Sequence, residues 1–372
     1  MEYRVTMVQD EGGLQGLEEA WSRLSGRSDA SSIFTSFPWS LAWWHSFGGD
    51  KSLYVLVASD AEGQVRGIAP LMLARYGPSR KLAWIGTGLG DTGDLVVDDG
   101  HAGPVIEAML AYLQQHRRDW DLLDLDEVPP YSHLASWLED HEPAGLRTIQ
   151  APRNDCPFIP IPATWEEYTQ TLQRKPRQHL ESFARRVVEE SGAYFRLVTE
   201  EADVPAAVAR FYALHRARWA TKEDELAPEH TEASFLPFLE ETCTRAAAHG
   251  LLRLCELCVG DATISSWISF NVNGRWNGYM TGFDPEWSSK RPGKVLHGFV
   301  MRQALAEHAR ELDLGRGNEG YKYEMGAVDR KNWRFVLAND TARSALAFGQ
   351  VRLRMQAREM VHRMQAAKPS SA

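Results

Sequence analysis

The order of predicted elements occurs twice along this chain, and this repetition constrains its fold more than any single motif. Each half is predicted to contain a helix, a two-stranded hairpin, a further strand, a loop, a second helix and a short strand, in that order. In the first half, the main strands are expected at 52–58, 66–74, 81–85 and 122–125, with helices over 14–24, after Trp39 and over 103–117. In the second half, the strands are expected at 194–198, 251–259, 262–272, 277–283 and 311–314, with helices over 164–191, 203–219, 231–248 and 295–310.

A proline-rich stretch separates the two repeats. Residues 143–164 contain five prolines and no helical periodicity, so they are expected to be a linker. The pattern predicts an α/β (α+β) chain of three parts: an N-terminal domain over 1–150, a second domain over 151–340, and a basic helical tail over 341–372. A length of 372 residues suits two or three units of ordinary size.

The charge is distributed unevenly between the halves. Of the formal net charge of −9, residues 1–150 carry 11 basic and 22 acidic side chains, a net of −11. The overall negative charge argues against a nucleic-acid coat protein. Because the beginning shows no signal-peptide pattern and no stretch reaches the apolar length of a membrane span, we expect a cytoplasmic protein. The basic tail adds the hypothesis of peripheral contact with the inner face of an anionic membrane.

Two motifs are more plausibly structural than functional. The stretch Gly88-Leu-Gly-Asp-Thr-Gly93 fits a dinucleotide-binding pattern, but a strand rather than a helix is expected to follow it. Asp91 and Asp94 would also repel a pyrophosphate, so a glycine-rich turn is favoured. Cys255 and Cys258 would point to opposite faces of one strand, which favours buried thiols and no metal site.

Two loops of the second half are the candidate functional segments. The first gathers cations, a proline and a glycine immediately before a helix, an arrangement that suits a phosphate. It consists of Ser289, Lys290, Arg291, Pro292, Gly293 and Lys294. The second loop follows the short strand at 311–314 and is rich in glycine and ionisable groups, as loops that line a site often are. Its candidate residues are Asp313, Arg316, Glu319, Tyr321 and Lys322.

Together these landmarks resemble the GNAT-superfamily acetyltransferases of the CelD-like, cellulose-biosynthesis type, which are relatives of the FemAB peptidyltransferases. The resemblance extends from about residue 33 to 335. It rests on Phe34-Thr-Ser-Phe-Pro-Trp39, Ile68-Ala-Pro-Leu71, Phe283-Asp-Pro285, Pro292-Gly293 and 313–322. It implies two tandem GNAT-like domains, each with a mixed, mostly antiparallel sheet flanked by helices. The second domain is expected to be catalytic and the first to be a degenerate structural partner.

The resemblance also implies acyl transfer from acyl-CoA, or from an acyl carrier protein, to an amine or hydroxyl by direct attack. The acceptor would be a small molecule, a sugar or a lipid. The loop 289–294 would hold the CoA pyrophosphate, although only part of the usual GNAT loop pattern is present. Glu319 is the first candidate for the general base and Asp313 the second. Lys322 would hold Glu319 or bind an acidic acceptor, and Tyr279 would protonate the leaving thiolate. Trp219, Arg316 and Tyr321 are expected at the substrate.

Two other functions compete with this interpretation. FemAB relatives use aminoacyl-tRNA as the donor, and nucleic acid is expected as a partner only in that case. The negative net charge and the lack of a long heptad arm make this second choice weaker. The third possibility is a non-catalytic scaffold built from two degenerate GNAT-like domains.

Overall fold

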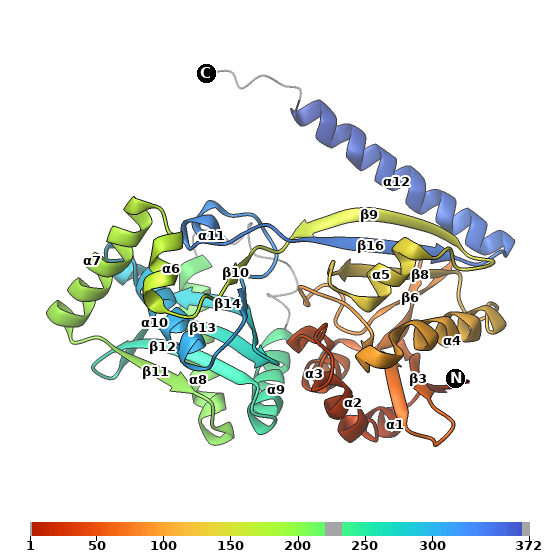
Figure 1. Cartoon of the computed structure of the whole chain (residues 1–372), viewed down its shortest axis with the longest axis horizontal. Coiled ribbons are helices and arrows are strands. Elements are labelled where there is room, and N and C mark those ends of the chain that lie inside the picture. The colour runs from red at the N-terminus through yellow and green to blue at the C-terminus, as the bar shows by residue number, and fades with distance from the viewer. Residues whose placement is uncertain (1, 220–232, 367–372) are drawn as a thin grey trace.

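The computed structural model describes residues 2–219 and 233–366, which form two lobes side by side with a long C-terminal helix that extends away from them (Figure 1). The first lobe contains β1 (Arg4–Val8), α1 (Glu11–Gln15), α2 (Glu18–Ser25), η1 (Ile33–Thr35), α3 (Phe37–Phe47), β2 (Ser52–Leu53), β3 (Val55–Ser59), β4 (Val65–Ala69), β5 (Leu71–Tyr76), β6 (Ser79–Trp84), β7 (Val96–Val97), η2 (Asp99–His101), α4 (Ala102–Gln115), β8 (Leu122–Val128), α5 (His133–Asp140) and β9 (Arg147–Asp155).

The second lobe contains most of the remaining elements. They are β10 (Phe158–Pro160), α6 (Trp165–Thr171), α7 (Arg174–Ser191), β11 (Tyr194–Val198), η3 (Glu201–Asp203), α8 (Val204–Trp219), α9 (Phe235–Ala248), β12 (Leu252–Val259), β13 (Ala262–Val272), β14 (Arg275–Phe283), η6 (Pro285–Lys290), α10 (Pro292–Ala306), β15 (Glu311–Asp313) and α11 (Gly320–Glu324). The chain ends with β16 (Lys331–Ala338) and α12 (Ala342–Ala366).

Each lobe contains a mixed sheet in which one parallel pair is joined by a crossover helix. In the first lobe, β6 and β8 are parallel and α4 connects them. In the second lobe, β14 and β15 are parallel and α10 connects them. The other strand pairs are antiparallel, in the orders β1-β3-β4-β7, β2-β5-β6-β8-β16-β9 and β10-β15-β14-β13-β12-β11. The expected fold class is thus confirmed. The strands expected at 52–58 and 66–74 are each divided in the structure, because β2 and β5 join one sheet whereas β3 and β4 join another.

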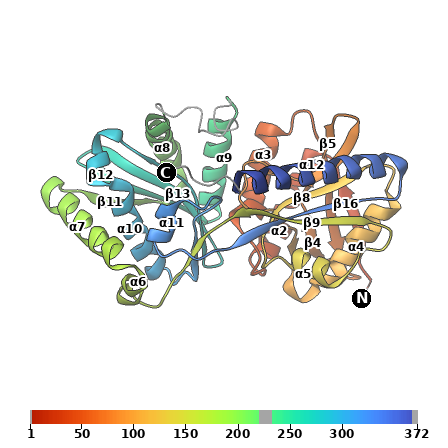
Figure 2. The same ribbon diagram turned by 90° about the horizontal axis from the view of Figure 1, so that it is seen from above.

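The strand pairing divides the chain differently from the boundaries at 150 and 340. Most of 147–155 lies beyond the first boundary, yet it forms β9 at the edge of the first lobe's sheet. β16 returns to the same sheet and lies between β8 and β9 (Figure 2). Part of the proline-rich stretch is therefore a strand and not a linker, because β9 pairs with β16.

Two predicted helices differ from the helices of the structure. The helix expected over 164–191 is broken at Leu172 and Gln173, whose extended backbone separates α6 from α7. α10 begins three residues before the expected position 295, since Pro292 occupies its first turn and its fixed φ suits that place.

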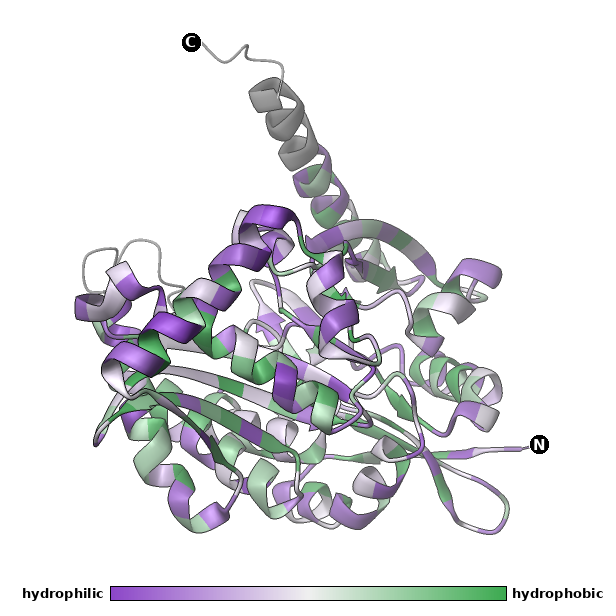
Figure 3. Ribbon diagram, turned by 60° about the vertical axis from the view of Figure 1, so that its left-hand side comes forward, coloured by the Kyte–Doolittle hydropathy of each residue, from purple (hydrophilic) through white to green (hydrophobic). Residues whose placement is uncertain are grey.

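The core continues across the boundary between the lobes. One cluster of buried side chains combines Trp39 and Phe34 from the first lobe with Phe238 and Met280 from the second. The rings of Trp39 and Phe238 are 5.0 Å apart and nearly perpendicular. Helices in the foreground of Figure 3 carry hydrophilic residues on the outside, and the strands behind them are largely hydrophobic. The two lobes therefore share apolar packing.

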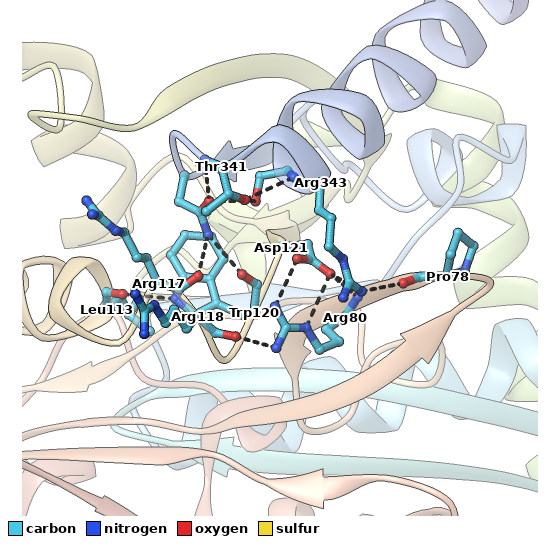
Figure 4. A network of polar contacts seen from close by, with 11 residues as sticks. Pro78, Arg80, Leu113, Arg117, Arg118, Trp120, Asp121, Thr341 and Arg343 are labelled. Atoms are coloured by element: carbon cyan, nitrogen blue, oxygen red, sulfur yellow. Dashed lines mark hydrogen bonds and ion pairs between the residues drawn. The ribbon is translucent and has the colours of Figure 1, made fainter.

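The predicted tail forms α12, whose beginning is fixed to the first lobe (Figure 4). Arg343 donates to the Pro78 carbonyl at 2.7 Å and forms an ion pair with Asp121 at 3.2 Å. Asp121 also pairs with Arg80 at 3.1 Å. Among the described residues, no helix combines the length and the apolar character needed to cross a membrane. The membrane contact suggested for the tail remains a prediction.

Candidate functional site

The parallel strands β14 and β15 separate shortly after they meet. They pair only from Arg275 to Asn277, opposite Glu311 to Asp313. β14 then continues to Phe283 without a strand on that side. A Cβ placed at Gly278 would be 2.9 Å from the Asp313 carbonyl oxygen, so a side chain at this position would push the strands apart. We call the opening between β14 beyond Asn277 and the chain after Asp313 the fork.

A cavity of about 340 Å³ lies at the fork. Its walls come from β13, β14, the start of α10, the end of α8 and the segment after β15. Six residues expected from the sequence line it: Tyr279, Arg291, Pro292, Gly293, Lys294 and Tyr321. The structure thus brings the predicted phosphate loop and two predicted tyrosines to one cavity.

The beginning of α10 gives one end of the cavity its polar character. Arg291 has φ 53° and ψ 52°, a left-handed conformation, and its side chain is exposed. The N–H of Gly293 has no hydrogen-bond partner among the described residues, and a Cβ on Gly293 would meet open space. A free N–H at a helix N-terminus, next to a cation, is a favourable site for a phosphate.

The other cations of the predicted phosphate loop are already bonded. Lys290 donates to the Ser191 hydroxyl at 2.7 Å and lies over the Trp287 ring. Lys294 forms an ion pair with Glu324. Ser289 and Lys290 do not contribute to the cavity wall, and Ser289 is exposed. Arg291 is therefore the cation of this loop that can respond most directly to an anion.

Tyr279 lies where β14 bulges. The register between β13 and β14 shifts at this point, so that Ile268 faces Met280 and Ser269 faces Gly278. The Tyr279 hydroxyl is buried and has no hydrogen-bond partner among the described residues. The Tyr279 ring packs against Phe34 and Trp39 of the first lobe. Burial raises the pKa of this phenol well above its usual range, so it stays protonated and can act as a donor.

Lys322 holds the backbone of the loop between β15 and α11. Its side chain is 2% exposed. Its ammonium donates to the carbonyl oxygens of Gly315, Arg316 and Gly317 at 3.0, 2.7 and 3.0 Å. With all three donors directed at carbonyls, Lys322 fixes the loop rather than facing the cavity.

Glu319 lies on the exposed side of the same loop. Its carboxylate is 3.1 Å from the Lys322 ammonium and its side chain is 54% exposed. It does not line the cavity, but its charge acts on both Tyr321 and Arg218, which do. Glu319 therefore lies at the rim, where a water molecule could connect it to the cavity.

Asp313 and Arg316 are engaged in structural ion pairs. Asp313 is buried, pairs with Arg330 and accepts a hydrogen bond from the Gly315 N–H at 2.8 Å. Arg316 forms an ion pair with Asp91 of the first lobe at 2.7 Å and donates to the Gly88 carbonyl at 2.9 Å. The glycine-rich stretch of the first half is thus a turn on which the second lobe's loop packs.

The end of α8 also contributes to the site. The sequence groups Arg218 and Trp219 in a polar cluster at a helix end, which suits either an anionic substrate or a solvated face. Arg218 lines the cavity, donates to the Thr281 hydroxyl at 2.9 Å and lies over the Phe283 ring. Trp219 is the last residue of α8, and its side chain lies outside the described part of the structure. No group of side chains suited to a metal ion occurs among the described residues.

Residues 174–323, from α7 to α11, match the model of a family described as acetyltransferase (GNAT) domain. The chain contains a GNAT-type domain. This domain includes the fork, the cavity and the start of α10. A search among curated proteins finds no sequence match to this chain.

Solved structures resemble the whole chain. FemX has a TM-score of 0.64 at 10% identity, covering 90% of this chain and 97% of FemX. L-PGS from Bacillus licheniformis has a TM-score of 0.55 at 12% identity, covering 89% of this chain and 92% of L-PGS. A Bacteroides thetaiotaomicron protein of unknown function has a TM-score of 0.57 at 11% identity, covering 90% of this chain and all 100% of the other. These likenesses concern the fold, and the CelD-like type stays a prediction.

Proposed function

We propose that this protein is an acyltransferase that binds an acyl-CoA, or the phosphopantetheine arm of an acyl carrier protein, in the cavity at the fork. The observation that carries this proposal is that one cavity joins a free helix N-terminus to an unpaired strand edge. The first suits a phosphate group and the second suits a thioester carbonyl. The GNAT-type domain over 174–323 supports the same conclusion.

The donor would be held at its charged end by α10. The Gly293 N–H, the positive end of a 15-residue helix and the Arg291 guanidinium converge there. When bound, the thioester supplies an activated acyl group. Beyond Asn277, the N–H groups on the free edge of β14 have no neighbouring strand, so they are available to polarise the thioester carbonyl.

Direct attack by the acceptor requires one group that takes a proton and one that gives a proton. The amine or hydroxyl of the acceptor attacks the thioester carbon, and the carbon–sulfur bond breaks. We assign proton donation to the thiolate to the Tyr279 hydroxyl, because it is protonated, buried and unpartnered at the cavity wall. We assign the removal of the acceptor proton to Glu319, acting through water from the rim.

This proposal is tested by CoA binding and by release of free CoA. We expect calorimetry to detect CoA binding to the purified full chain. With acetyl-CoA and a panel of amines and hydroxyl compounds, at least one acceptor should release CoA thiol. Glu319→Gln and Tyr279→Phe should each lower kcat by about 10²–10⁴-fold while leaving CoA affinity intact. An unchanged kcat in both variants would remove these two assignments.

A second donor is favoured by one observation, the likeness to FemX over both lobes. By the FemAB resemblance, the donor would then be an aminoacyl-tRNA, whose ester is also activated for transfer. A parallel assay with charged tRNA separates the two cases. Aminoacyl transfer without CoA binding would favour this alternative. A lack of transfer from acyl-CoA, from acylated carrier protein and from aminoacyl-tRNA would favour a non-catalytic scaffold.

A further inference from the structure

The two ends of the cavity differ in chemistry. One end is formed by the beginning of α10, with Arg291 and the Gly293 N–H. Apolar groups line other parts of the wall: Trp267 of β13, Leu296 of α10, Leu314 after β15 and Met325 after α11. Of these, Trp267 lies at the fork, beside Gly278. A ligand whose charge is held at α10 and which reaches the fork therefore meets the indole.

The indole ring of Trp267 forms the cavity wall at the fork. The residue is only 6% exposed. Its ring atoms Cζ2 and Nε1 are 2.9 and 3.0 Å from the place that a Cβ on Gly278 would occupy. The ring therefore lies against the backbone of β14 at the point where the strands separate, and the glycine makes this contact possible.

The indole is also supported from its other side. The Trp267 and His297 rings are stacked, with centroids 5.9 Å apart and planes at 27°. His297 is buried and is held in turn by Tyr168, whose hydroxyl lies 2.8 Å from its Nε2 atom. Because glycine backbone lies on one side and a fixed imidazole on the other, the indole cannot swing away without disturbing the core.

We propose that Trp267 is the residue that determines the length of the transferred acyl group and restricts it to short chains. This inference rests on the proposed function, since it assumes that a thioester occupies the cavity. The phosphates at α10 and the thioester at the fork direct the acyl group toward the indole. A chain of one or two carbons fits before the ring, and a longer chain collides with it.

The volume of the cavity agrees with a short acyl group. Ligand sites in proteins enclose about 300–1,000 Å³. At about 340 Å³, this cavity is near the lower end of that range. The pantetheine arm alone takes up much of that space. Replacement of the indole by a methyl group would extend the cavity toward His297.

The test measures the affinity of the full chain for CoA, acetyl-CoA, butyryl-CoA and octanoyl-CoA by calorimetry, and it needs no acceptor. We expect the unmodified protein to bind octanoyl-CoA at least about tenfold more weakly than acetyl-CoA, as an apolar pocket discriminates by size. In Trp267→Ala this discrimination should disappear, so that octanoyl-CoA and acetyl-CoA bind with similar affinity.

Two further variants show whether an effect of Trp267→Ala arises from a folding defect. Trp267→Leu removes part of the ring and should allow butyryl-CoA but discriminate against octanoyl-CoA. Trp165→Ala is the matched control: it removes a half-buried indole from the same core outside the cavity, and it should keep the original preference. The melting temperature of each variant shows that it is folded.

The outcomes separate this inference from the proposed function. Equal affinity of the unmodified protein for all chain lengths would overturn the role of Trp267 alone, and this measurement requires no variant. Discrimination that persists in Trp267→Ala and Trp267→Leu would do the same. Absence of binding of CoA and of every thioester would overturn the proposed function and, with it, this inference.

Discussion

At the scale of single residues, two buried ionisable groups of this protein are held by very different surroundings. Asp94 is 2% exposed; one carboxyl oxygen accepts from the Leu95 N–H at 2.8 Å, and the other has no partner among the described residues. Burial raises the pKa of this carboxyl to about 7. Lys322 is equally buried, but its ammonium is bonded to three carbonyl oxygens. The environment of each group decides whether its charge is tolerated.

Asp94 is expected to make the stability of the protein depend on pH. Because its pKa is higher in the folded chain than in the unfolded chain, the carboxyl costs no stability below about pH 4, and its cost is complete above about pH 7. Asp94→Asn should therefore raise the free energy of unfolding by up to about 4 kcal/mol at pH 8 and by no more than about 1 kcal/mol at pH 4.5. Urea unfolding at the two pH values measures this difference. Asp119→Asn, an exposed site, is the control and should show no such pH dependence.

Lys322 is expected to contribute to stability rather than to chemistry. Lys322→Met leaves the carbonyls of residues 315–317 without their donor, and each buried unpaired group costs about 1–3 kcal/mol. We expect a loss of at least about 3 kcal/mol by urea unfolding. Lys331→Met, at a site that is 49% exposed, should change stability by less than about 1 kcal/mol. An equally small effect at Lys322 would contradict the role of this ammonium in holding the loop.

At the scale of elements, the beginning of α10 combines backbone strain with the binding role that we propose for it. Arg291 occupies the residue before the helix in the left-handed region, which costs an L-residue about 1–2 kcal/mol. Glycine adopts this conformation freely, whereas alanine does not. The same residue supplies an exposed cation beside the Gly293 N–H. Substitutions of Arg291 can therefore separate the effect of backbone strain on stability from the effect of the charge on binding.

Two substitutions of Arg291 should have the same effect on binding and different effects on stability. Arg291→Gly and Arg291→Ala both remove the cation, so each should weaken CoA binding by a similar factor in calorimetry. Only Arg291→Gly should raise the free energy of unfolding, by about 1 kcal/mol, because it relieves the strain. If CoA affinity is the same in both variants as in the unmodified protein, the guanidinium does not contact the donor.

At the scale of the whole molecule, the two lobes are joined by shared packing and by the path of the chain, and we expect them to unfold as one cooperative unit. The chain leaves the first lobe through β9 and returns to it through β16, so the first lobe is built from two separate segments of the chain. A shared cluster of buried side chains crosses the boundary, and the Arg316–Asp91 ion pair links the loop near the fork to the first lobe. The first lobe is thus part of the support of the candidate site.

A single core substitution should therefore destabilise both lobes at once. Phe238 is fully buried on α9 and packs against Trp39 of the first lobe. Phe238→Ala should cost about 3–5 kcal/mol and keep one unfolding transition, followed by both circular dichroism and tryptophan fluorescence. Two separate transitions would show that the lobes unfold independently.

Features that depend on neighbouring residues could be predicted from the sequence. Hydrophobic periodicity predicted most helices and strands and their repeated order, because a helix or strand is recognised within a short window. The cations with Pro292 and Gly293 before a helix indicated a phosphate site, and the structure places Arg291 and Gly293 at a cavity. Local chemistry was sufficient to place these residues at a cavity, and phosphate binding stays a prediction.

Contacts between groups that are distant in the sequence depend on the tertiary structure. The return of β16 to the first sheet, the bonds of Lys322 to three carbonyls and the contact of Trp267 with Gly278 have no signature in the local pattern. Glu319 and Tyr279 lie 40 positions apart in the sequence, and their different positions, at the rim and on the cavity wall, follow from the separation of β14 and β15. The physical reason is that strand pairing and side-chain packing are cooperative over the whole chain, whereas periodicity and turn chemistry act over a few residues.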